Sequence, residues 1–166
     1  MPLPDGPYAR RTARILLLNK EDRLLLFKFG SRRRGGFTWL TPGGGVDEGE
    51  ALNAAAAREL HEETGLVVTP EELGGLVAVT GGFADLGWVK GILREDYFFF
   101  RVDALDVDIS GFTDYERKSI AEHRWWSVAD LETTAENIVP WGLAPLLASI
   151  VRDGPPENLV ELPWHH

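Results

Sequence analysis

The first third of the chain alternates short apolar runs with polar, glycine-rich breaks. Residues 12–18 (TARILLL) and 23–29 (RLLLFKF) are apolar runs of strand length, and the polar residues NKED separate them. Two such runs around a short polar break predict a β-hairpin. Residues 37–45 (FTWLTPGGG) predict another short strand, which Pro42 and three glycines interrupt. Residues 1–8 contain three prolines and predict a loose arm.

The period of an α-helix begins at residue 51. Within 51–64, Leu52, Ala56 and Leu60 follow one another at intervals of four residues and form one apolar stripe. The alanine run inside this stretch gives high helix propensity and permits close packing. Gly65 follows at the position where a helix commonly ends in the left-handed conformation. The pattern therefore predicts a helix over 51–64.

The pattern in the second half of the chain predicts further strands and two more helices. Apolar runs predict strands at 66–69, 75–80, 88–93 and 96–102. The residues GGFADLG (81–87) predict a turn or loop between two of these strands, and HRWWS (123–127) predicts the end of the sheet. Ser127 followed by Asp130 resembles a capping box that opens a short helix, and a last helix is predicted over 144–152. With no repeat or linker, residues 1–166 predict one mixed α/β domain.

Composition excludes several classes of protein. The chain has 44% hydrophobic and 26% charged residues, as soluble globular proteins do. No run approaches the roughly 20 apolar residues of a membrane span, and the first residues lack the order of a secretory signal. The absence of cysteine excludes disulfides, thiolate zinc sites and cysteine nucleophiles. We therefore expect a cytoplasmic protein without a membrane partner.

The charge of the chain limits its binding partners. A formal net charge of −9 argues against a long nucleic acid, which needs a basic surface. A small phosphorylated ligand remains compatible, because a bound metal ion or a local basic cluster reverses the local field. One such cluster is present in the polar loop 30–36, as the three arginines of residues 32–34.

Three glutamates occupy the last turns of the predicted helix. At about 100° per residue, Glu59, Glu62 and Glu63 fall on one arc about 100° wide, and His61 lies on the opposite face. Like charges at these spacings cost about 0.2–0.5 kcal/mol per pair, and the helix dipole adds to the cost. A hard cation such as Mg²⁺ or Mn²⁺ would remove this repulsion. The residues alone leave two interpretations open, a metal site and an acidic surface patch.

The spacing around these glutamates matches a known motif at every position. The motif is G-x5-E-x7-R-E-U-x-E-E-x-G-U, with U apolar, and its fixed positions here are Gly44, Glu50, Arg58, Glu59, Leu60, Glu62, Glu63, Gly65 and Leu66. This motif is the Nudix box, and the chain resembles the Nudix hydrolase family, MutT-like members included. The box covers 44–66, and the order of the surrounding elements is also similar. The resemblance implies the Nudix fold, a mixed β-sheet sandwiched between helices (an α/β/α sandwich).

The resemblance also implies roles for the residues of the box. In Nudix hydrolases the box glutamates hold divalent metal ions against a diphosphate, which implies as metal ligands Glu59, Glu62 and Glu63. Mg²⁺ is the implied cofactor, with Mn²⁺ as an alternative. Glu50 would orient Arg58, and Arg58 would hold the glutamates in place. Gly44 would let the backbone approach the helix and the substrate closely.

The general base of the reaction is left open by the box. Glu62 is one candidate, and family members often use a glutamate from a downstream loop instead. In this chain the downstream candidates are Glu116 and Glu122, although acids at such positions are more often surface residues. The sequence does not choose between them.

Residues outside the box are candidates for binding the substrate. Arg32 and Arg34 could clamp phosphates, because a guanidinium group matches phosphate oxygens, although a solvated basic loop is also compatible. Four aromatic residues could stack on a base or serve as core and loop anchors, namely Phe37, Trp39, Phe83 and Trp88. At the end of the sequence, His165 and His166 are assigned no role.

The resemblance implies a metal-dependent hydrolase that cleaves the diphosphate linkage of a nucleoside diphosphate derivative. One alternative is a Nudix-fold sensor or regulator that binds a nucleotide without cutting it, but such a protein is expected to lose box acids. Another alternative is a Nudix-fold isomerase, but that branch uses a cysteine. This chain keeps every box acid and has no cysteine, so the hydrolase is favoured.

The substrate is less well specified than the reaction. The extra motifs of the ADP-ribose, dinucleoside polyphosphate and coenzyme A branches are not found in this chain. Their absence favours a nucleoside triphosphate, common or damaged, and leaves nucleotide sugars open. The expected partner is thus a small nucleotide, and family members are often homodimers.

Overall fold

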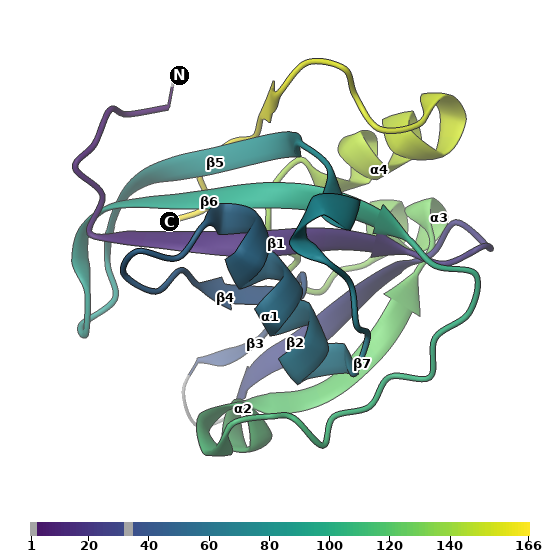
Figure 1. Cartoon of the computed structure of the whole chain (residues 1–166), viewed down its shortest axis with the longest axis horizontal. Helices are drawn as coiled ribbons and strands as arrows, with labels where there is room; N and C mark the ends of the chain where they lie inside the picture. Colours follow the sequence, from purple (N-terminus) through teal and green to yellow (C-terminus); the bar gives the residue numbers. More distant parts are fainter. Residues whose placement is uncertain (1–2, 32–34) are drawn as a thin grey trace.

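The computed structural model of the chain describes residues 3–31 and 35–166. Its strands form one mixed sheet of eight strands (Figure 1). The strands are β1 (Arg10–Leu18), β2 (Leu24–Ser31), β3 (Gly36–Leu40), β4 (Gly43–Gly45), β5 (Leu76–Asp85), β6 (Lys90–Arg101), β7 (Ile120–Trp126) and β8 (Val160–Glu161). The helices are α1 (Leu52–Thr64), α2 (Asp114–Ser119), α3 (Val128–Thr133), α4 (Leu143–Asp153) and a 3₁₀ turn, η2 (Pro70–Leu73). Residues 3–8 of the predicted arm have no regular secondary structure.

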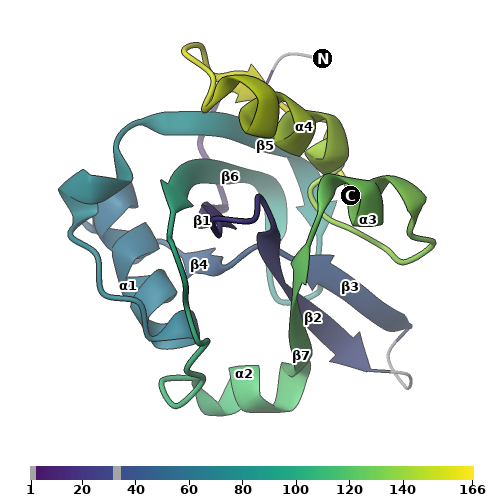
Figure 2. The ribbon, with the colours of Figure 1, turned by 90° about the vertical axis from the view of Figure 1, so that its right-hand side faces the viewer.

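The first two strands separate soon after the turn that joins them. They pair with each other at Leu18 and Leu24, next to the turn. From there β1 pairs in parallel with β6, whereas β2 pairs with β3 and β7. The order across the sheet is β3-β2-β1-β6-β5-β8, and Figure 2 shows β2, β3 and β7 bending away from β1 and β6. The strands predicted at 12–18 and 23–29 are present, but their hairpin pairing is short.

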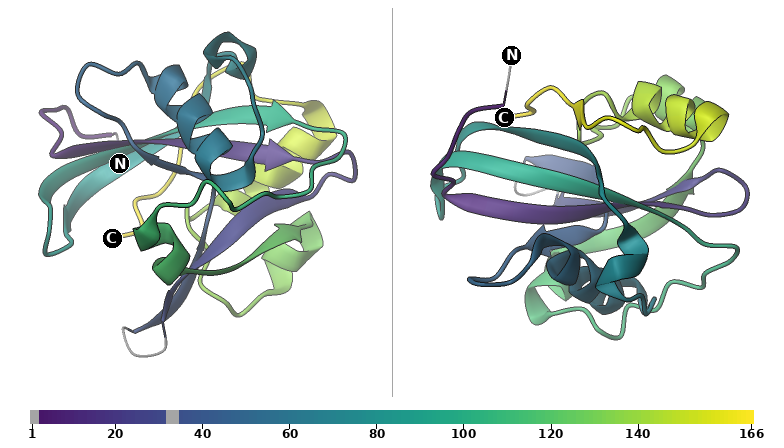
Figure 3. Two further views of the ribbon diagram at one scale, coloured as in Figure 1. Left: turned by 60° about the horizontal axis from the view of Figure 1, so that its bottom comes forward. Right: turned by 45° about the horizontal axis from the view of Figure 1, so that its top comes forward.

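Alternate residues of β1 point to opposite sides of the sheet, and apolar residues face both sides. Helices cover both faces and bury these residues. One core cluster joins β1 to α1 and includes Ala13, Ile15, Leu17, Ala55, Ala56 and Leu60. The other joins β1 to α3 and α4 and includes Leu16, Leu18, Leu131, Leu143 and Leu147. The right panel of Figure 3 shows α1 and α4 on opposite sides of the sheet. The predicted α/β/α sandwich is confirmed.

The helix predictions agree closely with the structure. The helix predicted over 51–64 is α1, and it ends at Gly65, whose φ of 80° is left-handed. The helix predicted over 144–152 is α4. Ser127 and Asp130 form the predicted capping box at the start of α3. In the described part of the chain, no helix is long and apolar enough to cross a membrane.

The predicted boundaries of β5 and β6 are wrong. Residues 81–87 were expected to form a turn or loop between two strands; the turn is present, but it is shorter and begins later, because β5 continues to Asp85 and Leu86 N–H donates to the Val89 carbonyl at 2.9 Å. The strands predicted at 88–93 and 96–102 are one strand, β6. The glycines that suggested a loop instead allow close packing, because a Cβ atom on Gly82 would overlap the Trp164 ring.

The strand predicted at 66–69 is also wrong. Leu66 and Val68 pack against the core cluster on the α1 side, but residues 66–69 belong to none of the strands of the described chain. Their apolar alternation therefore reflects packing after the end of α1 and not pairing in the sheet. The short elements η2, α2 and β8 were not predicted.

Candidate active site

The glycine strand β4 lies between β1 and the acidic turns of α1. It pairs antiparallel with β1, from Thr12 opposite Gly45 to Arg14 opposite Gly43. Because β4 has no side chains, the α1 carboxylates come up to its backbone. The N–H of Gly43 donates to Oε2 of Glu63 at 3.4 Å. A Cβ atom on Gly44 would overlap the carboxylate of Glu59, so only glycine leaves this carboxylate in its place.

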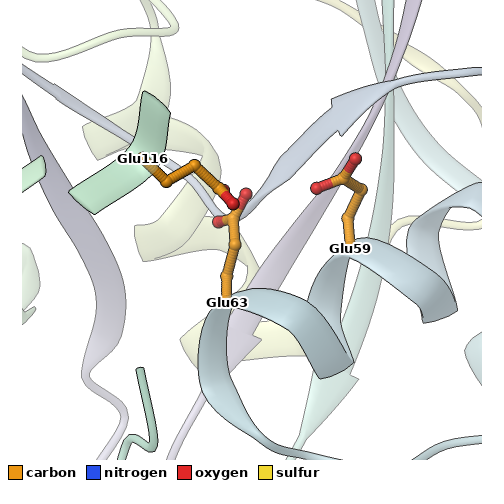
Figure 4. Close-up of side chains that lie close together, drawn as sticks. All are labelled: Glu59, Glu63 and Glu116. Atoms are coloured by element: carbon orange, nitrogen blue, oxygen red, sulfur yellow. The ribbon is translucent and has the colours of Figure 1, made fainter. Parts of the chain in front are cut away.

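Three carboxylates from two helices meet beside β4. Glu59, Glu63 and Glu116 each have a carboxylate oxygen within 4.8 Å of the other two (Figure 4). Glu59 and Glu63 lie one turn apart on α1, and Glu116 reaches the cluster from α2. The Glu116 side chain also accepts a hydrogen bond from the N–H of Thr113 at 2.9 Å, within the capping box that opens α2. This cap orients Glu116 toward the cluster.

Two of the clustered carboxyl groups, Glu59 and Glu63, are buried side by side. Glu63 is 1% exposed, and burial, followed by the charge of Glu59, raises the pKa of Glu63 well above its usual range. Burial also raises the pKa of Glu59, although the hydrogen bond from Arg58 acts in the opposite direction. Close, buried carboxylate oxygens without nitrogen or sulfur donors fit a hard divalent cation. The donor set of this site therefore agrees with the metal that the resemblance implies.

Arg58 connects the two ends of the Nudix box. Its Nε and Nη2 atoms donate to the two carboxylate oxygens of Glu50, each at 2.9 Å. Its Nη1 atom donates to Glu59 at 2.9 Å and lies 3.6 Å from Glu62. Its Nη2 atom also donates to the carbonyl of Gly45 at 3.1 Å. The hydrogen bond from Arg58 lowers the pKa of Glu50 to about 2, so this pair stays charged at neutral pH.

A cavity of about 840 Å³ opens over the carboxylate cluster. Arg10, Thr12 and Arg14 line it from the same face of β1 that carries Leu16 and Leu18 into the core further along. This change from polar to apolar residues along one face of β1 marks where the core ends and the cavity begins. The two arginines therefore bring positive charge into the cavity beside the acids.

The rim of the cavity carries exposed aromatic residues. Trp88 and Tyr115 are exposed, and both line the cavity. The guanidinium group of Arg10 lies 4.8 Å from the centre of the Trp88 ring, which is a cation–π contact. This arrangement offers a flat apolar surface close to positive charge.

The cavity also contains an ion-paired group that the sequence did not indicate. Glu95 of β6 accepts a hydrogen bond from Arg14 Nε at 3.0 Å and lies 3.0 Å from His165 Nε2. Burial opposes the charge of Glu95, but His165 and Arg14 together lower its pKa to about 2. Arg14 also donates to the carbonyl of Thr41 at 3.0 Å. These residues are far apart in the sequence and carry no local motif, so sequence analysis missed them.

The predicted acids of the downstream segment differ in position. Glu116 joins the carboxylate cluster, whereas Glu122 is exposed on β7, 3.3 Å from Lys28 Nζ, and does not line the cavity. Glu62 lines the cavity beside Glu59. Gly44 also lines it, as expected for a backbone close to the substrate.

Of the four aromatic residues predicted to contact the substrate, only Trp88 lines the cavity. Trp39 is 2% exposed and packs edge-on against Trp126 in the core, with ring centres 5.0 Å apart, so we do not retain it as a stacking residue. Phe37 and Phe83 do not line the cavity, whereas Trp88 does. Arg32 and Arg34 lie outside the described residues.

Comparison with known proteins agrees with this geometry. A family model of the NUDIX domain matches residues 8–148, so the chain belongs to the Nudix family. The RNA pyrophosphohydrolase of Roseobacter denitrificans is 37% identical over 147 residues, which cover 81% of this chain and 84% of that protein. The RNA pyrophosphohydrolase of Sphingopyxis alaskensis is 33% identical over 165 residues, which cover 90% and 94%.

Solved structures show the same fold. The MutT protein from Methanosarcina mazei Go1 has a TM-score of 0.65 and 21% identity, and the match covers 90% of this chain and 97% of that chain. A NUDIX hydrolase from Nitrosomonas europaea has a TM-score of 0.62 and 18% identity, covering 88% and 90%. The family match and the sequence relatives together identify this protein as a Nudix hydrolase.

Proposed function

We propose that this protein is a divalent-cation-dependent hydrolase that cleaves a diphosphate linkage of a nucleoside 5′-triphosphate. The observation that carries this proposal is the meeting of Glu59, Glu63 and Glu116 within 4.8 Å in a cavity that also contains Arg10 and Arg14. Carboxylates for a cation and arginines for phosphates are both needed to bind a polyphosphate. The cavity volume of about 840 Å³ lies within the range of small-molecule sites and suits one nucleotide.

The proposed cation ligands are the acids of the α1 turns that line the cavity, Glu59, Glu62 and Glu63. A bound Mg²⁺ or Mn²⁺ ion would neutralise the phosphate charge and lower the pKa of a water molecule. Arg58 fixes Glu59 by direct hydrogen bonding, and Glu50 fixes Arg58. Arg14, held by Glu95, is positioned to contact a phosphate oxygen.

We assign the general base to Glu116. Its carboxylate belongs to the cluster, and its helix cap holds it there, whereas Glu122 lies outside the cavity. Glu116 would accept a proton from the attacking water as the water oxygen bonds to phosphorus. The bond from that phosphorus to the bridging oxygen then breaks, and the leaving phosphate keeps the bridging oxygen.

A second candidate substrate carries the same triphosphate group at the 5′ end of an RNA. The names of the relatives with 33–37% identity favour it. The net charge of −9 and the single-nucleotide size of the cavity favour a free nucleotide. We therefore place the free nucleoside triphosphate first and the RNA 5′ end second.

The test compares turnover of a panel of substrates with and without Mg²⁺ or Mn²⁺. The panel contains the common and oxidised nucleoside triphosphates, ADP-ribose, nucleotide sugars and a short RNA with a 5′-triphosphate. We expect metal-dependent release of phosphate or pyrophosphate, fastest with nucleoside triphosphates. Faster turnover of the RNA would favour the second candidate, and nucleotide binding without any turnover would favour a sensor protein.

Two matched variants test the assignment of Glu116 as the general base. Glu116→Gln should lower kcat by about 10²–10⁴-fold, the usual contribution of a general base. Glu122→Gln removes the same charge from an exposed position on β7 and should leave kcat within about twofold, as expected for an exposed acid outside the site. Equal rates for the two variants would refute the assignment of Glu116.

A further inference from the structure

A second wall of the cavity comes from residues 164–166 at the end of the segment 160–166, which lies far from the Nudix box in the sequence. β8 at the start of this segment pairs in parallel with β5. Thr80 Oγ1 lies 3.0 Å from the carbonyl oxygens of both Leu162 and Pro163, and its single hydroxyl proton is shared between them. Trp164 Nε1 donates to the carbonyl of Phe83 at 2.9 Å. These contacts fix the backbone up to Trp164, so the end of the segment is a built wall of the site.

The next residue, His165, places an imidazole ring inside the cavity. Its side chain is 3% exposed, and its Nε2 atom lies 3.0 Å from Oε2 of Glu95. Its Nδ1 atom is buried and has no hydrogen-bond partner within the described residues. A buried polar atom without a partner costs about 1–3 kcal/mol, so a ligand that supplies a partner gains affinity there.

The surroundings of His165 select against a phosphate group. The Glu95 carboxylate lies 3.0 Å from His165 Nε2, so a phosphate bound against the His165 ring itself would be repelled by it. Trp164 and His166 also line the cavity, and their ring centres lie 4.7 Å and 4.8 Å from that of His165. Aromatic rings in contact beside a fixed carboxylate suit a flat, uncharged group that carries N–H donors. A nucleobase has this chemistry.

We propose that His165 is a specificity-determining residue that contacts the nucleobase of the substrate, with the segment 160–166 holding it in place. This inference rests on the proposed function, because it assigns the phosphates to the carboxylates and arginines of the cavity and the base to His165. In the neutral ring, Nε2–H donates to Glu95 and Nδ1 is an acceptor. An amino or imino N–H on the edge of a base is the complementary group.

The test separates contact with the base from support of Glu95. His165→Gln keeps an amide N–H₂ in place of Nε2, which can still donate to Glu95, but removes the Nδ1 acceptor. His165→Ala removes both. The probes are the four common nucleoside triphosphates and ribose 5-triphosphate, which has no base.

We expect both variants to raise KM for the nucleoside triphosphates by about 3–10-fold, the usual worth of one hydrogen bond, with kcat within about twofold. The ratio of kcat/KM between bases should also change, and ribose 5-triphosphate should be unaffected. His123→Ala is the matched control, because His123 is exposed on β7 and does not line the cavity. Thermal unfolding of each variant checks that the fold is intact.

Several results would overturn this inference. A normal His165→Gln enzyme beside an impaired His165→Ala enzyme would mean that His165 only supports Glu95. An equal loss with ribose 5-triphosphate would exclude contact with the base. If the wild-type protein cleaves none of the probes, titration with the four nucleoside monophosphates replaces turnover. Weaker binding by His165→Gln would then support the inference even though the proposed reaction fails, and no binding by the wild-type protein would refute both.

Discussion

Arg58 donates to both carboxylate oxygens of Glu50, eight residues earlier in the chain, at 2.9 Å each. The same guanidinium group donates to Glu59 and to the carbonyl of Gly45. One side chain therefore joins the loop before α1, the glycine strand β4 and the acidic turn of α1. A planar group with five donors can make all of these bonds at once, whereas a lysine cannot.

This relationship predicts that Arg58 contributes to catalysis through the position of Glu59. Arg58→Ala and Arg58→Lys should both lower kcat by about 10–100-fold, the usual effect of losing a residue that orients a metal ligand. Lysine should not rescue, because it cannot donate to both oxygens of Glu50 and to Glu59 together. Steady-state kinetics at saturating Mg²⁺ measure the loss.

The control for this prediction is Arg152→Ala, which removes an exposed arginine whose partner is its neighbour Asp153. It should leave kcat unchanged. Full activity of Arg58→Lys would contradict the argument, because it would show that charge alone is sufficient.

The box residues could be predicted from the sequence because their geometry is local. The spacing of Glu59, Glu62 and Glu63 on one helix fixes their common direction before any tertiary contact is known. Glu116 could not be separated from Glu122 in this way, because its place in the cluster depends on where α2 docks. The capping-box pattern of Thr113 and Glu116 was a usable signal for the start of α2, and it was overlooked.

The errors in the predicted fold also come from contacts between segments that are distant in the sequence. The pairing of β1 with β6 and of β2 with β7 joins distant segments, so the apolar runs predicted the strands but not the early separation of their hairpin. Gly81 and Gly82 looked like loop residues because the side chain that packs on Gly82, Trp164, follows it by 82 positions. The contact of His165 with Glu95 depends on the same return of the chain.

The crowded carboxylates predict an unusual effect on stability. Glu63→Gln should raise the free energy of unfolding of the metal-free protein by roughly 0.2–0.5 kcal/mol, because it removes the like-charge pair that Glu63 forms with Glu59, one turn earlier on α1. The amide oxygen of glutamine can still accept from Gly43 N–H. Turnover should fall by several orders of magnitude. Urea unfolding in EDTA measures the stability.

Added Mg²⁺ provides the second half of this test. It should raise the unfolding temperature of the wild-type protein, since a cation that binds only the folded state stabilises it. The increase should be lost or much reduced in Glu63→Gln. Glu132→Gln, an exposed change on α3, is the control and should behave as the wild type. A Glu63→Gln protein with normal turnover would refute the metal site.

The lowered pKa of Glu95 predicts that its contribution to the stability of the fold is lost at acid pH. Its pKa is about 2 in the folded protein against an ordinary value of 4.5. A lowered pKa means that the charged form is stabilised by folding, so the contribution is complete above pH 4.5 and is lost as the pH falls toward 2. The shift corresponds to on the order of 3 kcal/mol. Wild type should therefore exceed Glu95→Gln in stability at pH 7, and the difference should shrink on acidification.

Urea unfolding of both proteins at pH 7, 4.5 and 3 tests this prediction. The other acids titrate in both proteins, so the difference reports on Glu95 together with its partners Arg14 and His165. Glu157→Gln, at an exposed position, should differ little from wild type at each pH. A constant difference between wild type and Glu95→Gln over this range would show that the contacts of Glu95 with Arg14 and His165 do not stabilise the fold.

The close contact between Gly44 and Glu59 predicts that a larger residue at position 44 lowers activity. Gly44→Ala places a methyl group where the Glu59 carboxylate lies, so Glu59 must move away from Glu63 and Arg58. A displacement of about 1 Å can lower turnover by about 100-fold. Gly75→Ala is the matched control, since no atom lies within 4 Å of its added methyl group. It should keep full activity, with a gain in stability of about 0.4–1 kcal/mol from reduced freedom of the unfolded chain. Equal activity of the two variants would show that the contact between β4 and Glu59 is not needed for the reaction.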